Sequence, residues 1–275
     1  MFEILESRQL VPNIHMLSVR APEVAQQVQP GNFIILRAYE DGERIPLTVS
    51  DWDKQRGTIT LVFMSVGVTT SRLATMRTGD MLPTVVGPLG NPFELGAYGT
   101  VACVGGCYGI ASIYPAARAL KEMGNKVCTV IEARSSFLFY WEEKLKRVSD
   151  RLIYITRDGT KGFKGHINQL PEIFRTLEIS PDWLLINGCN YVMMRASEAT
   201  QPMGWKTTVS LNTLMIDGTG MCGVCRVTVG GKTKFTCVDG PHFDGHQVDW
   251  EELAQRRKAY LREEVIPMQS SRAEI

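Results

Sequence analysis

The feature that most constrains the fold of this chain is a change of sequence texture near residue 98. Before it, short runs rich in β-branched and aromatic residues, at 14–20, 32–39 and 58–64, are separated by turn residues such as glycine, proline and aspartate. One helix is expected at 69–76. Many short strands joined by regular turns predict a small, closed, antiparallel β-barrel, which we assign to residues 1–97.

After residue 98, strand-like and helix-like segments take turns along the chain. Strands are expected at 101–104, 127–132, 152–156 and 183–187. Helices are expected at 110–123, 137–148, 166–177 and 191–199. This alternation is typical of βαβ units. We therefore predict that residues 98–208 form an α/β domain with a mostly parallel sheet of the nucleotide-binding type.

The last part of the chain, residues 209–275, loses this alternation. Its first half is rich in glycine and contains three of the seven cysteines. A charged helix is expected at 250–265, and its apolar side consists of Trp250, Leu253, Leu261 and Val265. We therefore predict a small third module, and a multidomain chain as a whole.

Composition excludes several classes of function. The formal net charge is +1, whereas nucleic-acid-binding domains normally carry a marked excess of Lys and Arg. No apolar run approaches the roughly 20 residues that are needed to cross a bilayer. The N-terminal segment contains acids where a signal peptide needs bases, so we expect a cytoplasmic protein without a nucleic-acid or membrane partner.

The cysteines of the third module have the spacing of an iron–sulfur site. The segment Asp217-Gly-Thr-Gly-Met-Cys222-Gly-Val-Cys225 is followed by Cys237. A plant-type [2Fe–2S] site uses C-x4-C-x2-C and a more distant cysteine, and here Asp217 stands in the first position. The glycines allow the loop to wrap its amides around the ligands. We predict Asp217, Cys222, Cys225 and Cys237 as ligands of a [2Fe–2S] cluster.

Other interpretations of this loop remain open. Three cysteines and an acid could hold a structural zinc, or the thiols could be unliganded in a buried hairpin. Asp217 could be a turn residue, with the fourth ligand coming from another side chain nearby. The candidates for that ligand are Asp239, Asp244, His242 and His246.

A glycine-rich turn follows the first predicted strand of the α/β domain and opens a helix: Gly105-Gly106-Cys-Tyr-Gly109-Ile110. In such a turn the glycines let a pyrophosphate approach the backbone, and the helix N-terminus supplies amide donors. Any tight turn between a strand and a helix could have the same composition. The strand–loop–helix context favours a dinucleotide site.

Residues after two other strands bear on the same site. Glu132 is placed to bind a ribose 2′-hydroxyl, which would favour NAD, whereas Arg134 could accept the 2′-phosphate of NADP. Gly188 and Cys189 follow a later strand, at the sheet edge where ligands bind in such domains. Cys189 could face a nicotinamide, or it could be a buried thiol.

In the first domain, the segment Arg44-Ile-Pro46-Leu47-Thr48 lies on a predicted strand, and Gly67 precedes a predicted helix that begins with Thr69, Thr70 and Ser71. An arginine near a helix N-terminus that carries hydroxyl groups could bind a diphosphate. The hydroxyl groups could instead serve as a helix N-cap.

Together these motifs resemble those of the ferredoxin-reductase-like electron-transfer flavoproteins, and the resemblance covers essentially the whole chain. It implies an FAD-binding barrel, a nicotinamide-binding sheet and a C-terminal [2Fe–2S] module. Pro30-Gly31-Asn32-Phe33 is similar to the family's PGQF turn. The segment 44–48 is similar to its flavin motif, which implies that Arg44 binds the FAD phosphates and that Thr48 lies near the isoalloxazine.

The resemblance extends to the remaining cofactor residues. Pro46 and Leu47 belong to the flavin motif, although Leu47 stands where many relatives have a tyrosine. The segment 67–73, with Gly67, Thr69, Thr70 and Ser71, is similar to the family's pyrophosphate loop. The glycine loop at 105–111 is similar to its nicotinamide loop. Thr48 and Cys189 are the candidates for catalytic residues beside the reacting rings.

Two branches of this family are similar to the chain. One contains the electron-transfer subunits of NAD-dependent dihydroorotate dehydrogenase, which have four cysteine ligands and end soon after the last one. The other contains the small subunits of NADH-dependent reduced ferredoxin:NADP+ oxidoreductase, also known as sulfide dehydrogenase subunits, in which an aspartate ligand is typical. Asp217, together with the predicted helix after Cys237, favours the second branch.

The resemblance implies an oxidoreductase subunit that moves electrons between NAD(H), FAD and a [2Fe–2S] cluster, with NADP(H) as the other candidate nicotinamide. Its partner would be a larger iron–sulfur flavoprotein subunit, which would perform flavin-based electron bifurcation and reach ferredoxin. The alternatives are an electron-transfer subunit of dihydroorotate dehydrogenase and a non-enzymatic zinc or redox-sensing module.

Overall fold

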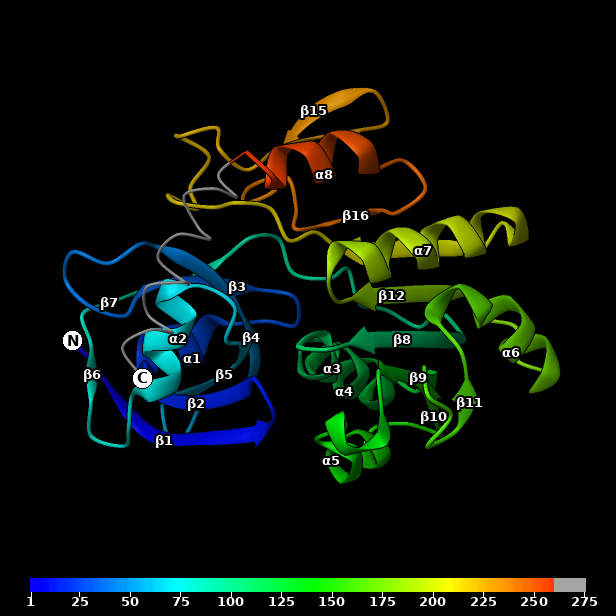
Figure 1. Ribbon diagram of the computed structural model, residues 1–275, viewed down its shortest axis with the longest axis horizontal. Helices are drawn as coiled ribbons and strands as arrows, with labels where there is room; N and C mark the ends of the chain where they lie inside the picture. The colour runs from blue at the N-terminus through cyan, green and yellow to red at the C-terminus, as the bar shows by residue number, and fades with distance from the viewer. Residues whose placement is uncertain (260–275) are drawn as a thin grey trace.

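The computed structural model describes residues 1–259, and Figure 1 shows two halves joined by a C-terminal layer. The first half is a seven-stranded antiparallel sheet with the order β6-β1-β2-β5-β4-β3-β7. Its strands are β1 (Phe2–Val11), β2 (Ile14–Arg20), β3 (Phe33–Arg37), β4 (Ile45–Asp53), β5 (Thr58–Met64), β6 (Met81–Leu82) and β7 (Thr84–Leu89). The sheet curls into a nearly closed barrel, as expected, and is accompanied by α1 (Pro22–Gln27) and α2 (Val68–Thr75).

The second half is a seven-stranded sheet with the order β11-β10-β9-β8-β12-β13-β16. Its strands are β8 (Thr100–Gly106), β9 (Lys126–Ala133), β10 (Arg151–Thr156), β11 (Phe163–Lys164), β12 (Trp183–Asn187), β13 (Lys206–Ser210) and β16 (His242–Asp244). All neighbouring pairs are parallel except β13 with β16. The predicted parallel sheet is confirmed, and an antiparallel strand from the C-terminal segment extends it.

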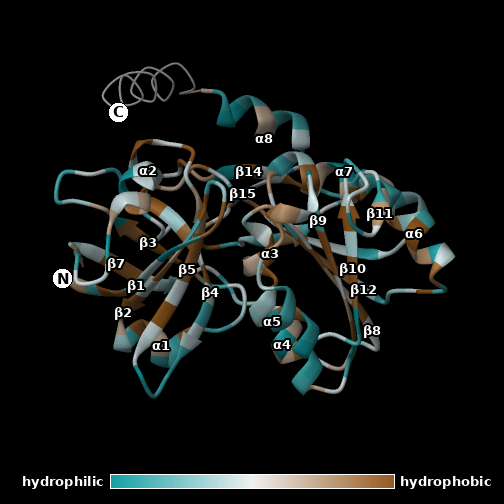
Figure 2. Cartoon of the chain, turned by 60° about the horizontal axis from the view of Figure 1, so that its bottom comes forward, coloured by the Kyte–Doolittle hydropathy of each residue, from teal (hydrophilic) through white to brown (hydrophobic). Residues whose placement is uncertain are grey.

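Helices cover both faces of this sheet. They are α3 (Gly109–Ser112), α4 (Tyr114–Glu122), α5 (Glu142–Arg147), α6 (Leu170–Thr176) and α7 (Asn190–Thr200). The central strands of the sheet are apolar and α4 is mostly polar on its outer face, as Figure 2 shows. Within residues 1–259, no helix combines the length and the apolar character that spanning a membrane requires.

Three predicted helices are shorter or broken in the structure. The helix expected at 110–123 is divided at Ile113, because Pro115 lies at the start of α4 and cannot continue an uninterrupted helix. The one expected at 166–177 becomes a short 3-10 helix, Ile167–Gln169, followed by α6, which also has a proline in its first turn. The one expected at 137–148 begins only at Glu142, because Trp141 has the left-handed φ of 56°.

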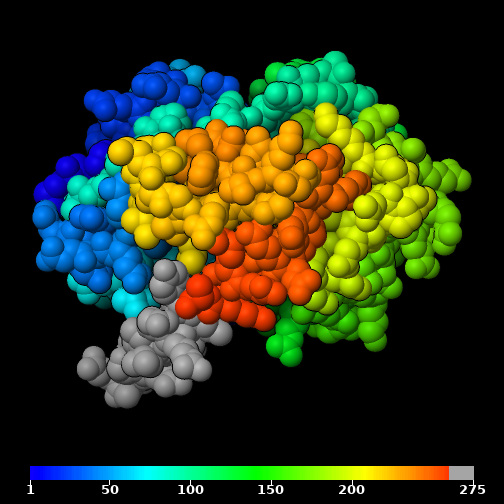
Figure 3. Space-filling view, turned by 90° about the horizontal axis from the view of Figure 1, so that it is seen from above, coloured from blue at the N-terminus to red at the C-terminus, as the bar shows by residue number. Residues whose placement is uncertain are grey.

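The C-terminal segment contains the hairpin of β14 (Arg226–Val229) and β15 (Lys232–Phe235), followed by α8 (Trp250–Arg257). The helix predicted at 250–265 is confirmed as far as α8 and buries Leu253. The rest of that prediction, with Leu261 and Val265, lies outside the described residues. Figure 3 shows this segment lying across both halves of the molecule.

The buried residues of this segment belong to cores that it shares with its neighbours. Cys225 and Cys237 pack with Phe33 and Ile35 of the barrel, whereas Leu253 packs with the α/β sheet. So short a segment buries little surface by itself, and the two halves therefore supply most of the packing that orders it.

An ion-pair network joins the barrel directly to the α/β half. Asp51 of β4 accepts hydrogen bonds from Arg118 Nη1 at 2.8 Å and from Lys144 Nζ at 2.5 Å. The Arg118 guanidinium also lies 5.0 Å from the centre of the Trp52 ring. This partly buried carboxylate therefore helps to fix the two halves relative to each other.

Candidate functional site

The glycine loop after β8 packs tightly against the end of β12. A Cβ atom on Gly109 would lie 2.1 Å from the carbonyl oxygen of Asn187, and one on Gly105 would lie 2.8 Å from the carbonyl oxygen of Gly109. Only glycine therefore fits at these two positions. The predicted residues Gly105, Gly106, Gly109 and Ile110 thus lie beside Gly188 and Cys189 at the carboxyl edge of the sheet.

We expect Gly109→Ala to destabilise the α/β half by about 3 kcal/mol, because the new methyl group would overlap backbone atoms that cannot move aside easily. Gly124→Ala is the matched control. Gly124 has a φ of +83° but open space around it, so the substitution should cost only about 1 kcal/mol. Urea unfolding of both variants measures the difference. Equal losses of stability would show that the packing of the loop against β12 contributes nothing.

Two tyrosines fix the backbone of this loop, a role that the sequence analysis did not assign. Tyr108 Oη donates to the Gly188 carbonyl at 2.9 Å and accepts from Asn212 Nδ2 at 2.8 Å. Tyr140 Oη donates to the Cys107 carbonyl at 2.8 Å. Burial raises the pKa of Tyr108 to about 12, so its hydroxyl stays protonated as a donor.

The thiols of Cys107 and Cys189 both lie at this edge. Burial raises the pKa of Cys107, and the neighbouring Cys189 raises it further. Cys189 stands at the N-cap of α7 and is only half-buried. Cys189 is thus neither fully buried nor fully exposed, and its place beside a nicotinamide stays a prediction.

Glu132 is more deeply buried than its predicted role at a ribose suggested. Its side chain is only 2% exposed, and its Oε1 lies 3.4 Å from both Arg157 Nε and His166 Nδ1. Burial raises the pKa of Glu132, and Arg157 opposes that shift. Its Oε2 is buried without a hydrogen-bond partner among residues 1–259. Arg134 is exposed. Arg157 contacts Glu132 and is therefore a second cation beside the predicted ribose residue.

The predicted flavin strand divides its residues between two faces. Pro46 and Thr48 of β4 pair with Ile35 and Phe33 of β3, on the face that packs against the third module. Leu47 lies on the opposite face and packs against the barrel interior. A side chain at position 47 is therefore directed away from the cysteines.

The hydroxyl groups before and within α2 make local contacts. Thr70 Oγ1 accepts from the amides of Val66 at 3.0 Å and Gly67 at 2.9 Å, and Ser71 Oγ lies 3.1 Å from Ser65 Oγ. Thr69 Oγ1 donates to Glu43 at 3.3 Å. The N-cap residue of α2 is Gly67, and Thr70 bonds back to its amide from within the first turn, so the N-cap interpretation of these hydroxyl groups is wrong. Binding of a pyrophosphate by this loop stays a prediction.

The cysteine loop, residues 216–237, brings two of its predicted ligands together. Cys225 Sγ lies 3.3 Å from Cys237 Sγ, and both residues are buried. Cys222 is exposed, and Asp217 Oδ2 accepts from the amides of Thr219 at 2.9 Å and Met221 at 3.3 Å. Within residues 1–259, no three Cys, His, Asp or Glu side chains converge closely enough to hold a metal ion.

The chemistry of the loop nevertheless fits an iron–sulfur cluster. Gly218, Gly220 and Gly223 all have positive φ angles, as a loop that wraps its backbone around a cluster requires. Burial and the neighbouring Cys225 raise the pKa of the Cys237 thiol to about 12, and Cys222 is close enough to contribute. Binding of iron would therefore release protons from these thiols.

Each of the alternative fourth ligands already has a hydrogen-bond partner in the structure. His242 lies 2.8 Å from Ser210 Oγ, and His246 lies 3.0 Å from Thr200 Oγ1. Asp239 accepts from the amide of Phe235, whereas Asp244 accepts from that of His246. Of the candidates weighed, Asp217 and Asp239 are therefore those whose carboxylates accept from amides of the cysteine loop, and Asp217 also stands in the first ligand position.

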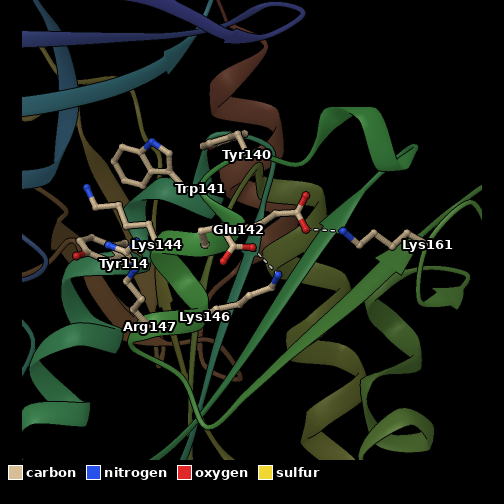
Figure 4. A pocket seen from close by; sticks show the side chains of 9 residues that line it. Tyr114, Tyr140, Trp141, Glu142, Lys144, Lys146, Arg147 and Lys161 are labelled. Atoms are coloured by element: carbon tan, nitrogen blue, oxygen red, sulfur yellow. Dashed lines mark hydrogen bonds and ion pairs between the residues drawn. The ribbon is translucent and has the colours of Figure 1, made fainter.

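A groove of about 800 Å³ lies beside α5, away from the predicted sites (Figure 4). Three of its four basic side chains are paired with acids: Lys144 with Asp51, Lys146 with Glu143 and Lys161 with Glu142. These three charges are therefore neutralised by acids of the protein itself, and one of the pairs, Lys144 with Asp51, joins the α/β half to the barrel.

Known proteins resemble this chain over its whole length. A family model for the iron–sulfur cluster binding domain of dihydroorotate dehydrogenase B matches residues 212–249. The chain is 42% identical over 265 residues to a Thermotoga maritima protein described as a homologue of the electron transfer subunit of dihydroorotate dehydrogenase B (NAD(+)), which covers 96% of this chain and 93% of that protein. It is 28% identical over 258 residues to the Enterococcus faecalis electron transfer subunit, covering 90% of this chain and 97% of the other.

Solved structures agree with these relatives. A chain in the structure of NADH-dependent reduced ferredoxin-NADP oxidoreductase, determined to give insight into flavin-based electron bifurcation, has a TM-score of 0.92 and 40% identity, covering 98% of this chain and 97% of the other. A ferredoxin NADP+ reductase from Neisseria gonorrhoeae shares the fold, with a TM-score of 0.62 and 17% identity over 74% of this chain and 91% of the other. The chain therefore belongs to the family of dihydroorotate dehydrogenase B electron transfer subunits and their homologues, oxidoreductase subunits with a ferredoxin-reductase-like fold.

Proposed function

We propose that this chain is an electron-transfer flavoprotein subunit that moves electrons between NAD(H), FAD and a [2Fe–2S] cluster. A bound flavin would exchange two electrons with a nicotinamide and single electrons with a cluster. The protein would hold these groups in sequence, from the glycine loop after β8, along the barrel, to the cysteine loop. NAD(H) is the proposed nicotinamide and NADP(H) the other candidate, because Glu132 is buried beside Arg157 while Arg134 is exposed.

The observation that carries the proposal is the position of β3 between two predicted sites. Phe33 and Ile35 of this strand pair with Thr48 and Pro46 of the flavin motif. The same two side chains pack with Cys225 and Cys237. Residues paired across neighbouring strands lie about 5 Å apart, so an electron would cross only a short, packed path between flavin and cluster.

A larger iron–sulfur flavoprotein subunit is the proposed partner, with bifurcation to ferredoxin as the activity of the complex. The 40% identity to a chain of NADH-dependent reduced ferredoxin-NADP oxidoreductase supports this choice, as does Asp217 in the first ligand position. Exposed apolar side chains of the cysteine loop, among them Met221 (87% exposed) and Ile216 (52% exposed), offer a contact surface. A reducing cytoplasmic location would suit the seven free cysteines.

The second candidate is electron transfer in a dihydroorotate dehydrogenase. It is favoured by the family model that matches residues 212–249 and by the name of the Thermotoga maritima relative. The two candidates differ most in the large subunit, and within this chain in the first ligand position, which holds Asp217.

Isolation of the native complex under anaerobic conditions separates the candidates. We expect the large subunit to be an iron–sulfur flavoprotein, and the complex to couple oxidation of NADPH to simultaneous reduction of ferredoxin and NAD+. A partner that oxidises dihydroorotate, with no reduction of ferredoxin, would establish the second candidate and contradict the first.

A further inference from the structure

Arg44 lies one residue before β4 and makes contacts with the cysteine loop that the flavin motif does not account for. Its Nε donates to the carbonyl oxygen of Ile216 at 2.7 Å, and its Nη2 donates to that of Asp217 at 3.3 Å. These residues are 172 and 173 positions away in the chain. A single guanidinium therefore holds two consecutive carbonyl groups of the loop from the barrel side.

The geometry depends on the shape of the arginine side chain. A guanidinium presents several N–H donors in a rigid, planar fork, whereas a lysine ammonium is a point charge on a flexible stem. Lysine at position 44 would keep the positive charge but could not reproduce the two parallel bonds. The residue is also close enough to lower the pKa of the Asp217 carboxyl, after the larger effect of the bonds from Thr219.

The two carbonyl groups stand immediately before the most constrained point of the loop. Gly218 has a φ of +84°, and a Cβ there would lie 2.8 Å from Leu89 Cδ1 and 3.0 Å from Ile35 Cγ1. From this point the Asp217 carboxylate bonds forward to Thr219 and Met221, which lead to Cys222. The segment 216–221 is thus attached to the barrel by Arg44 and by packing against β3 and β7.

We propose that Arg44 is a positioning residue for the iron–sulfur cluster: its fork holds the Ile216–Asp217 backbone on the barrel, and thereby fixes the first ligand position relative to the flavin strand. This inference rests on the proposed function, because it presumes that the loop binds a cluster. It places Arg44 at the junction of the two sites, instead of at the FAD phosphates alone.

The test compares Arg44→Lys and Arg44→Gln with Arg151→Lys, all in the full-length protein purified without air. Arg151 is the matched control, because its Nη1 also donates to a backbone carbonyl, that of Leu177 at 3.1 Å, but in the α/β half. The measurements are the rate at which an iron chelator removes the cluster, the EPR g-values of the dithionite-reduced protein, and the FAD content.

We expect both Arg44 variants to lose the cluster about tenfold faster than the wild type and to show shifted g-values, because two hydrogen bonds to the ligand loop are gone. Arg151→Lys should match the wild type in both respects. Should Arg44→Gln fail to fold, Arg44→Lys decides, since it keeps the charge.

Two outcomes would overturn the inference in different ways. If the Arg44 variants lose only FAD, with unchanged chelation rate and g-values, Arg44 acts on the flavin alone while the proposed function stands. If the wild-type protein itself contains no iron, the proposed function fails, and the positioning role fails with it.

Discussion

Cys237→Ala is expected to abolish cluster binding while leaving the flavin in place. Cys237 Sγ lies 3.3 Å from Cys225 Sγ and is buried against the barrel, so its loss removes one of the two ligands that are already together. Thiolates are the donors that hold [2Fe–2S] clusters, and alanine supplies none. Iron content should fall from about two atoms per chain to nearly zero, with loss of the EPR signal on reduction.

Cys128→Ala is the control for this experiment. Cys128 is also a buried thiol, but it lies in β9 within the core of the α/β half. We expect this variant to keep its iron and its EPR signal, and to lose only the small stability that a buried methyl-sized group contributes. Equal iron contents in Cys237→Ala and the wild type would mean that the cysteine loop does not ligate the metal.

Acidification is expected to destabilise the protein through His242. This imidazole stacks on Phe93 with 3.7 Å between ring centres. In its neutral form Nε2 donates to the Gly31 carbonyl at 3.2 Å, and Nδ1 accepts from Ser210 Oγ at 2.8 Å. Burial lowers its pKa to about 3, against an ordinary value of 6.5. It therefore connects the barrel, the α/β sheet and the C-terminal segment in its neutral form.

A lowered histidine pKa means that the unfolded chain binds a proton that the folded protein does not. Stability is therefore complete above pH 6.5 and falls as the pH is lowered towards about 3, by up to about 1.4 kcal/mol per pH unit. Urea unfolding between pH 8 and pH 4 measures this slope. His242→Gln should be less stable than the wild type at pH 8. Its stability should then fall less steeply with acid, because unfolding of the variant binds nearly one proton fewer.

His246→Gln provides the comparison within the same segment. His246 bonds to Thr200 Oγ1, so its replacement should lower stability at pH 8 through the loss of that hydrogen bond. Identical pH slopes for the wild type and His242→Gln would contradict the assignment of this proton to the buried imidazole.

Much of the fold could be predicted because it depends on local sequence patterns. The alternation of apolar strands with amphipathic helices is recorded in neighbouring residues, and so the parallel sheet and the barrel were both expected. The sequence analysis did not predict the breaks within helices, because at each break a single residue outweighs the helical spacing of its neighbours. Pro115 and Trp141 each interrupt a helix whose flanking residues have the correct spacing.

The parts that could not be predicted depend on contacts between distant segments. β16 joins the α/β sheet through the pair Ser210 and His242, which stand 32 positions apart in the chain with the cysteine loop and the hairpin between them. The bonds of Arg44 to the cysteine loop and of Tyr108 to Asn212 are of the same kind. A sequence motif names residues that bind a cofactor, but it does not say which other parts of the chain hold them in place.

We propose that electrons pass between the nicotinamide and the cluster through the flavin, within this one chain. Rapid mixing of the anaerobic, oxidised protein with NADH, followed by freeze-quenching, tests it directly. We expect the flavin absorbance to bleach first and the EPR signal of a reduced [2Fe–2S] cluster to follow, whereas protein stripped of FAD should give no such signal. A cluster signal that forms equally fast without FAD, or a flavin that bleaches while the cluster stays oxidised, would contradict it.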